Sequence, residues 1–235
     1  MYDIAIVISL ERRKDRANRV FKHLEDRGIH NIYSLPAYDG ANITPNIVKI
    51  TPPPRSYFSF RDELSNQPTN YLNRFQVACA LSHIAAIKFA KMLGAKRVLI
   101  VEDDVEFVED IADRLVALED ETKDLVWEHI YLGGALRGWA GHLTLPVSKH
   151  LVKPGFTDGL QAYLVQGEGF NKIANAMLSF KTTNDDAIND IMFRESNPLK
   201  AYMHIPKLAF QIKDFSELDR RVIDRQDLRK EDHGV

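Results

Sequence analysis

Residues 97–104 have the sequence RVLIVEDD, and this stretch decides the fold. Its aliphatic residues form an apolar run of the length of one buried strand. Three consecutive acids, Glu102, Asp103 and Asp104, stand at the end of that run. In an open α/β sheet the carboxyl ends of the strands border the ligand crevice. The stretch therefore predicts an α/β sheet whose acids project into a cleft.

The three acids favour a bound cation. Like charges this close repel one another, and each carboxylate loses hydration as the cleft narrows. Carboxylate oxygens suit Mg²⁺ or Mn²⁺, which proteins commonly hold with a few acids and the phosphates of a substrate. The same acids would equally suit a solvated turn that caps a helix beginning near Glu106, because acids are favoured at helix starts.

The composition is that of an ordinary globular chain. The 235 residues are 45% hydrophobic and 27% charged, and the length fits one large α/β domain better than two small ones. The formal net charge of −2 gives no general attraction to nucleic acid or to an anionic membrane. We expect neither a transmembrane segment nor a leader. The single cysteine, Cys79, excludes an internal disulfide and a zinc cluster built from cysteines, so we expect a reducing compartment such as the cytoplasm.

The first forty residues predict a strand–helix–strand unit. Residues 3–9 are mostly apolar, as in a buried parallel strand. The amphipathic helix that follows ends at Gly28, and residues 31–35 form the second strand. No glycine fingerprint separates the first strand from its helix, which argues against a dinucleotide site. Arginines occupy this turn instead and suit an anionic or planar group.

The rest of the chain predicts further helices and strands in alternation. The expected helices are residues 74–93, residues 111–118, residues 169–180 and one that begins near Ala187 after the cap Asn184-Asp185-Asp186; the expected strands are 128–132, 160–165 and 207–212. We expect a long loop or lid at residues 41–73 and a small hairpin or acceptor-side loop at residues 138–159. The charged residues from 216 to 235 indicate an exposed helix or a disordered tail.

Several stretches, taken in order, resemble glycosyltransferase family 25, which contains bacterial lipooligosaccharide galactosyltransferases and collagen hydroxylysine galactosyltransferases. The matching stretches include the LSH and EDD motifs and are residues 7–16, 37–40, 80–83, 98–104, 161–164 and 185–186. Members commonly carry a glycine before the LSH motif, where this chain has Val77-Ala78. The resemblance covers residues 1 to about 215.

The resemblance implies a GT-A-like fold, which is a doubly wound, mostly parallel sheet with flanking helices, as a single domain over residues 1–215. It implies transfer of a hexose such as galactose or glucose from a nucleotide sugar, UDP-linked, to an acceptor hydroxyl with inversion. Mn²⁺ or Mg²⁺ would assist by neutralising charge on the departing diphosphate.

The acceptor implied by the resemblance is a glycan, a glycolipid or a protein, as in lipopolysaccharide biosynthesis. The enzyme would work in the cytoplasm or at the periphery of a membrane that carries its acceptor. The net charge argues against long nucleic acid as a partner. A modified nucleobase stays open as an acceptor.

Position and resemblance together assign roles to individual residues. Glu102, Asp103 and Asp104 would hold the metal and the nucleotide diphosphate, with Asp104 as the most direct metal ligand and His204 as a further one. The nucleoside would lie in the first strand–helix turn. The residues expected there are Ser9, Leu10, Arg12, Arg16 and Asp39, with Ser82 and His83 as secondary donor-binding residues. The catalytic base would be Asp185 or Asp186, because inversion needs a carboxylate on the acceptor side.

Two other classes of protein stay open. A metal-dependent phosphohydrolase would also use clustered acids and Mg²⁺, and it would release free sugar or phosphate without an acceptor. A non-catalytic carbohydrate- or nucleotide-binding module would bind its ligand without turnover.

Overall fold

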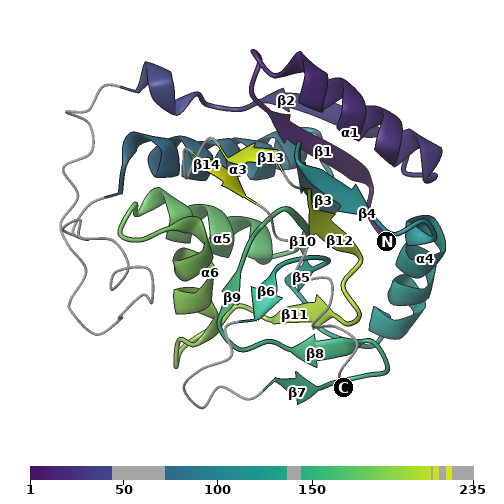
Figure 1. Ribbon diagram of the computed structural model, residues 1–235. Coiled ribbons are helices and arrows are strands. Elements are labelled where there is room, and N and C mark those ends of the chain that lie inside the picture. Colours follow the sequence, from purple (N-terminus) through teal and green to yellow (C-terminus); the bar gives the residue numbers. More distant parts are fainter. Residues whose placement is uncertain (44–71, 137–143, 213, 217–220, 224–235) are drawn as a thin grey trace.

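A central eight-stranded sheet organises the molecule (Figure 1). The computed structural model describes residues 1–43, 72–136, 144–212, 214–216 and 221–223. Six strands of the sheet run in one direction, and β10 and β8 run opposite to them. The predicted α/β class with a mostly parallel sheet is therefore confirmed. In spatial order the strands are β2 (Ile32–Pro36), β1 (Ile4–Ser9), β3 (Arg97–Glu102), β10 (Ala162–Gln166), β5 (His129–Tyr131), β11 (Ala201–His204), β8 (Leu151–Lys153) and β7 (Leu145–Pro146).

Helices cover both faces of this sheet. Ile4, Ile6 and Ile8 of β1 join the hydrophobic core beneath α3, α5 and α6. Ala5 and Val7 point to the opposite face and join the core beneath α1 and α4. Fully burying an aliphatic side chain of this size contributes about 1.5–3 kcal/mol, so the alternation along β1 fixes a helical layer to each face. These helices are α1 (Lys14–Asp26), α3 (Arg74–Met92), α4 (Ile111–Thr122), α5 (Gly169–Leu178) and α6 (Asn184–Met192), and a short 3₁₀ helix, η1, spans Gly40–Asn42.

The predicted strand–helix–strand start is confirmed. All six residues of β1 are buried, and β1 pairs in parallel with both β2 and β3. Gly28 follows α1 with a φ of +73°, a backbone conformation that glycine adopts without strain. This arrangement places the C-terminal ends of β1 and β3 side by side.

Helix α3 has the ends that its sequence predicts. Asn73 Oδ1 accepts hydrogen bonds from the backbone N–H groups of Phe75 and Gln76, at 2.9 Å and 3.0 Å. Gln76 Oε1 accepts the N–H of Asn73 at 2.8 Å, which completes a reciprocal capping box. Gly94 follows the last turn with a φ of +76°. These caps fix the helix register and thereby the direction in which Cys79, Ser82 and His83 point.

The structure corrects two expectations near the acids. The helix expected near Glu106 is wrong: the chain forms β4 (Val105–Phe107), which pairs antiparallel with β12 (Ala209–Gln211), and α4 begins at Ile111. The helix expected near Ala187 begins earlier, at Asn184, because the side chain of Thr183 caps it in place of Asn184 or the aspartates.

Two further strand pairs lie outside the central sheet. β6 (Ala135–Leu136) pairs with β9 (Thr157–Asp158), and β13 (Asp214–Ser216) pairs with β14 (Arg221–Ile223). The second pair lies across the domain boundary set at residue 215, where the sequence indicated helix or disorder. Residues 44–71 of the expected lid and residues 138–143 of the expected hairpin lie outside the described residues.

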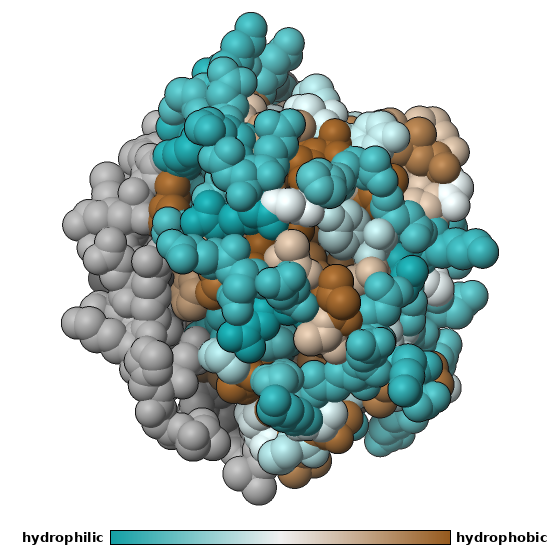
Figure 2. Space-filling view, turned by 90° about the vertical axis from the view of Figure 1, so that its right-hand side faces the viewer, coloured by the Kyte–Doolittle hydropathy of each residue, from teal (hydrophilic) through white to brown (hydrophobic). Residues whose placement is uncertain are grey.

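The surface to the right in Figure 1 carries mainly hydrophilic side chains, with hydrophobic ones in small groups between them (Figure 2). Scattered exposure of this kind is ordinary for a folded chain. Among the described helices, none combines the length and the apolar character that crossing a bilayer requires.

Candidate functional site

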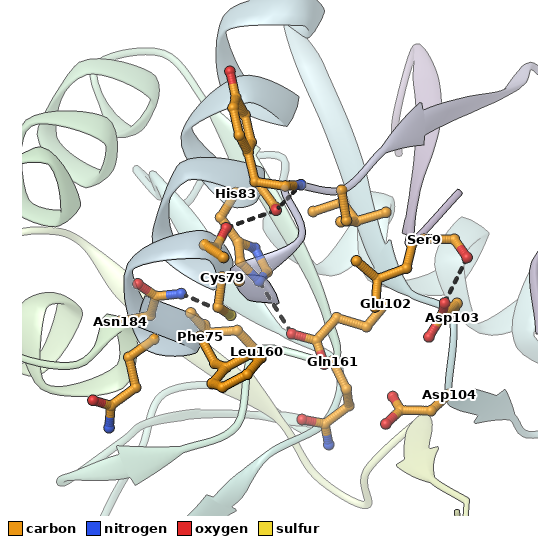
Figure 3. A pocket seen from close by; sticks show the side chains of 18 of the residues that line it. Ser9, Phe75, Cys79, His83, Glu102, Asp103, Asp104, Leu160, Gln161 and Asn184 are labelled. Carbon is orange, nitrogen blue, oxygen red and sulfur yellow. Dashed lines mark hydrogen bonds and ion pairs between the residues drawn. The ribbon is translucent and has the colours of Figure 1, made fainter. Parts of the chain in front are cut away.

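A cavity of about 210 Å³ lies at the C-terminal ends of β1 and β3, against α3 and the start of α6 (Figure 3). This is the edge of the sheet at which open α/β folds bind ligands. Ten of the residues singled out from the sequence line it, namely Ser9, Leu10, Arg16, Asp39, Ser82, His83, Glu102, Asp103, Asp104 and Asp185. The fold thus collects residues from four distant parts of the chain into one pocket.

Asp103 is held from the side of the first strand–helix turn. Its carboxylate accepts a hydrogen bond from Ser9 Oγ at 2.5 Å and one from Arg16 Nη1 at 3.4 Å. Arg16 is only 4% exposed, so the structure keeps a guanidinium largely out of water beside this acid. Burial raises the pKa of Asp103, and the hydrogen bond from Ser9 and the charge of Arg16 oppose that rise. Ser9 and Arg16 therefore orient Asp103.

Asp104 is the most deeply buried of the three acids, at 8% exposure. Its Oδ2 accepts a hydrogen bond from Gln211 Nε2 at 2.7 Å. Its Oδ1 is buried and has no hydrogen bond to any described residue. Burial, followed by the charge of Glu102, raises the pKa of Asp104 well above the usual range. A buried carboxylate oxygen with no donor is costly unless a proton or a cation satisfies it, so the oxygen set here fits Mg²⁺ or Mn²⁺.

Glu102 is positioned by the LSH motif on α3. His83 Nε2 lies 3.1 Å from Glu102 Oε1, and His83 Nδ1 lies 2.8 Å from the hydroxyl of Tyr163. Ser82 uses different partners: its hydroxyl donates to the Ala78 carbonyl at 2.8 Å and accepts the N–H of Tyr38 at 2.9 Å. Ser82 and His83 are thus no nucleophile–base pair, as their adjacent helical positions predict.

The rim of the pocket at the first turn is tied together by an ion pair. Arg12 Nε donates to Asp39 Oδ2 at 2.8 Å, and Asp39 Oδ1 accepts the N–H of Ala41 at 2.9 Å. The Arg12 guanidinium lowers the pKa of the Asp39 carboxyl. Arg12 is 46% exposed, so this pair sits at the water-facing edge. The predicted residues of this turn are together in space, although Arg12 does not line the cavity.

The two candidate bases are placed differently. Asp185 lines the cavity, and burial together with the charge of Asp158 raises the pKa of its carboxyl to about 7. The N–H of Gly159 hydrogen bonds to the same carboxylate and opposes that rise. Asp186 instead accepts a hydrogen bond from Thr183 Oγ1 at 3.0 Å, within the cap of α6. Of these two aspartates, only Asp185 therefore lines the pocket, and its raised pKa makes it a base near neutral pH.

His204 lies apart from the acids. It ends β11, and two strands, β10 and β5, stand between β11 and β3. At ~4.8 Å per strand this is a separation of about 14 Å. Its Nδ1 lies 2.7 Å from the Pro206 carbonyl oxygen, and its ring stacks on His150. We therefore leave His204 out of the proposed metal site.

Several lining residues were not singled out from the sequence. Gln211 hydrogen bonds to Asp104 from β12, more than a hundred residues away, and no local sequence pattern predicts this contact. Phe75 packs so closely on Gly40 that a Cβ at that glycine would lie 2.5 Å from Phe75 Cδ1. Gly40 of the AYDG stretch could therefore have indicated that a bulky side chain packs against this part of the pocket wall. Other residues that line the pocket and were not singled out from the sequence include Tyr38, Gln76, Leu160, Gln161 and Thr183.

A family model decides the assignment. The model for glycosyltransferase family 25, described as an LPS biosynthesis protein, matches residues 3–139, which is more than half of the chain. The chain belongs to glycosyltransferase family 25. The predicted family is confirmed, and the match includes the turn at Ser9, the LSH motif and the acid triplet. Asp185 lies beyond the matched residues of this family 25 chain.

Curated relatives support the same family. This family 25 chain is 27% identical over 226 residues to procollagen galactosyltransferase 2 of Homo sapiens, covering 89% of this chain and 35% of the relative. It is 28% identical over 208 residues to a Bos taurus protein named probable inactive glycosyltransferase 25 family member 3, covering 86% and 33%. The chain spans about a third of the length of these relatives.

Among solved structures, this family 25 chain is similar to a glycosyltransferase involved in the glycosylation of the major capsid of PBCV-1. The TM-score is 0.46 and the sequence identity 9%, over 92% of this chain and 96% of the other.

Proposed function

We propose that this chain is a metal-assisted glycosyltransferase that moves a hexose from a UDP-sugar to an acceptor hydroxyl with inversion. One observation carries the proposal: a single pocket holds both the acid triplet and the basic carboxylate of Asp185. Transfer from a nucleotide sugar needs charge neutralised at the diphosphate, and inversion needs a base at the acceptor. The name of the Homo sapiens relative makes galactose the first donor sugar to test, ahead of glucose.

The donor nucleotide would bind at the first strand–helix turn. Ser9 ends β1 and Leu10 follows it, and both line the pocket, so the nucleoside would lie against them. The buried guanidinium of Arg16 is fixed beside Asp103 and would attract the negatively charged diphosphate. The Arg12–Asp39 pair would keep the rim of this pocket in shape.

The acid triplet would hold Mn²⁺ or Mg²⁺ through Asp104 and Glu102. The buried Asp104 Oδ1, which has no donor among the described residues, supports Asp104 as the most direct ligand. When bound, such an ion neutralises the charge that develops on the departing nucleoside diphosphate. Ser9 and Arg16 orient Asp103, and His83 orients Glu102, before any ligand arrives.

Asp185 would act as the general base. As the acceptor oxygen bonds to the anomeric carbon and the bond from that carbon to the diphosphate breaks, Asp185 takes the proton of the acceptor hydroxyl. A pKa of about 7 makes this carboxylate a far stronger base than an exposed aspartate. The carboxylate of Asp186 accepts the hydrogen bond of the Thr183 hydroxyl, which favours Asp185 over Asp186 as the base.

The acceptor that we propose is a glycan, a glycolipid or a protein, as in lipopolysaccharide biosynthesis. The cytoplasm, or the edge of a membrane that carries the acceptor, stays our prediction for where the reaction takes place. The relative's name directs the first acceptor panel to procollagen peptides as well as to glycolipids.

A matched pair of variants tests the proposal. With UDP-galactose, Mn²⁺ and an acceptor panel, Asp185→Asn should lower the transfer rate by about 10²-fold or more, and Asp186→Asn should retain most of it. Calorimetry should show that Asp185→Asn still binds UDP with Mn²⁺, whereas Asp104→Ala binds it at least tenfold more weakly. Equal turnover by wild type and Asp185→Asn would overturn the assignment of the base.

A second candidate is a binding module without turnover. The relatives that carry the word inactive in their names favour it. The intact acids and the raised pKa of Asp185 count against it, because a site without turnover has no need to keep a partly buried, basic carboxylate. Tight UDP-sugar binding with no product on any acceptor would support the module. Free sugar or phosphate released without acceptor would instead indicate a phosphohydrolase.

A further inference from the structure

Three metal-binding side chains converge beside the acid triplet. The sulfur of Cys79, a ring nitrogen of His83 and a carboxylate oxygen of Glu102 all lie within 4.8 Å of one another. Figure 3 shows the three side chains pointing to the same part of the pocket, with Cys79 and His83 on α3 and Glu102 at the end of β3.

The helix explains the convergence. Cys79 and His83 are four residues apart, so they lie one turn apart on the same face of α3. Two ligands at this spacing on a helix can reach one metal ion, as in other zinc sites built on helices. Glu102 completes a third corner, because it lies on the same face of β3 as Val98 and Ile100, which pack in the core beneath α3. All three residues line the cavity, which gives an ion a route of entry.

The donor set differs in character from that of the acids. Sulfur, imidazole nitrogen and one carboxylate oxygen suit Zn²⁺ and similar thiophilic ions, whereas Mg²⁺ prefers oxygen alone. Ligand atoms around tetrahedral Zn²⁺ lie roughly 3.5 Å apart. The 3.1 Å between His83 Nε2 and Glu102 Oε1 is already close to that value. The widest separation in the cluster is at most 4.8 Å, so it needs to shorten by at most about 1.3 Å, which small side-chain rotations supply.

Two of the three side chains already have hydrogen-bond partners that would support metal binding. The Tyr163 hydroxyl lies 2.8 Å from His83 Nδ1, so its oxygen can accept a hydrogen bond from the Nδ1–H group when Nε2 binds a metal. Asn184 Nδ2 donates to the sulfur of Cys79 at 3.2 Å, and this contact would stabilise a thiolate. Metal-bound histidines in proteins almost always have such a partner on the other nitrogen.

We propose that Cys79, His83 and Glu102 form a site for a thiophilic divalent cation, Zn²⁺, with a fourth position open to the cavity. Glu102 belongs both to this site and to the acid triplet. Zn²⁺ bound here would therefore make Glu102 unavailable to an Mn²⁺ or Mg²⁺ ion at Asp104. Binding would release the thiol proton of Cys79. The sulfur gives this site a preference for Zn²⁺ that the oxygen ligands around Asp104 lack.

Cobalt spectroscopy tests the site without any donor or acceptor, so the result is independent of the proposed transferase activity. Because Cys79 is the only cysteine, a thiolate-to-Co²⁺ charge-transfer band can come from no other residue. The band should saturate at one ion per chain, disappear when Zn²⁺ is added, and persist in excess Mg²⁺. It should be absent in Cys79→Ser and in His83→Asn, and unchanged in His30→Ala, whose side chain is exposed elsewhere. Tyr163→Phe should bind Zn²⁺ about 10-fold more weakly.

A measurement on wild-type protein guards against variants that do not fold. Zn²⁺ should slow the alkylation of Cys79 by iodoacetamide, followed by mass spectrometry, whereas Mg²⁺ should not. Wild-type protein that gives no charge-transfer band, or alkylation that proceeds equally with and without Zn²⁺, would overturn the proposal. Equal Zn²⁺ affinity of wild type and folded Cys79→Ser would do the same.

Discussion

Substituting Asp185 by asparagine should make the folded protein more stable at alkaline pH. Burial and the carboxylates of Asp158 and Asp186 raise the pKa of Asp185 from 3.8 to about 7. Between these values the folded state keeps a proton that the unfolded chain has released, so the free energy of unfolding falls as the pH rises. Below pH 3.8 the carboxyl is protonated in both states, and its raised pKa does not change the free energy of unfolding. Above about pH 7 it is ionised in both states, and the free energy of unfolding has fallen by the full amount.

The size of the effect follows from that shift. About 3 pH units at ~1.36 kcal/mol each set an upper limit of about 4 kcal/mol. Asp185 is partly exposed to the cavity, and water there screens the charge, so we expect about 2 kcal/mol. In a domain of this length such a gain raises Tm by roughly 4–8 °C. Asparagine keeps the size of the side chain and its carbonyl oxygen can accept the N–H of Gly159, so packing should not change.

Urea denaturation near pH 8 and again near pH 4.5 measures the difference, which should be much smaller at the lower pH. Asp186→Asn is the matched control. Asp186 sits in the first turn of α6 and accepts the Thr183 hydroxyl, so its loss should cost about 0.5–1 kcal/mol rather than stabilise. An Asp185→Asn protein that is no more stable than wild type near pH 8 would refute the reasoning. The raised pKa that supports Asp185 as the general base would then be wrong.

Three further predictions test the base, the pocket wall at Gly40 and the core. The kcat/KM of transfer should rise with pH through a midpoint near 7 as Asp185 ionises, and a flat profile between about pH 5.5 and 8.5 would contradict this. Gly40→Ala should lower stability by about 1–3 kcal/mol by differential scanning fluorimetry, because its Cβ would lie 2.8 Å from the backbone of Phe75. Leu99→Ala, at a fully buried position of β3, should lower the free energy of unfolding in urea by about 2–5 kcal/mol. Val116→Ala, at a 65% exposed position, should change it by no more than ~0.5 kcal/mol, and similar losses in both variants would contradict the prediction.

The sequence by itself determined the local elements and the chemistry of the acids. An unbroken apolar run predicts a strand buried on both faces, and β1 and β3 are such strands. Gly28 and Gly94 predict where α1 and α3 stop, and Asn73 predicts where α3 starts, because these signals act between residues a few positions apart. The acids at the end of β3 could be assigned to a cleft for the same reason: the position of a strand end is a local property.

Only the tertiary structure decided which distant residues join that cleft. The insertion of β10 between β3 and β5, antiparallel to both, carries no signature in its own residues, since strand order depends on pairing between segments far apart in the chain. That order keeps His204 away from the acids. The pairing of β12 with β4 brings Gln211 to Asp104, and the start of α6 places Asp185 in the same pocket. Whether an aspartate caps a helix or faces a pocket depends on its surroundings, and here Thr183 takes the cap, so Asp185 is left in a partly buried, negatively charged place that raises its pKa.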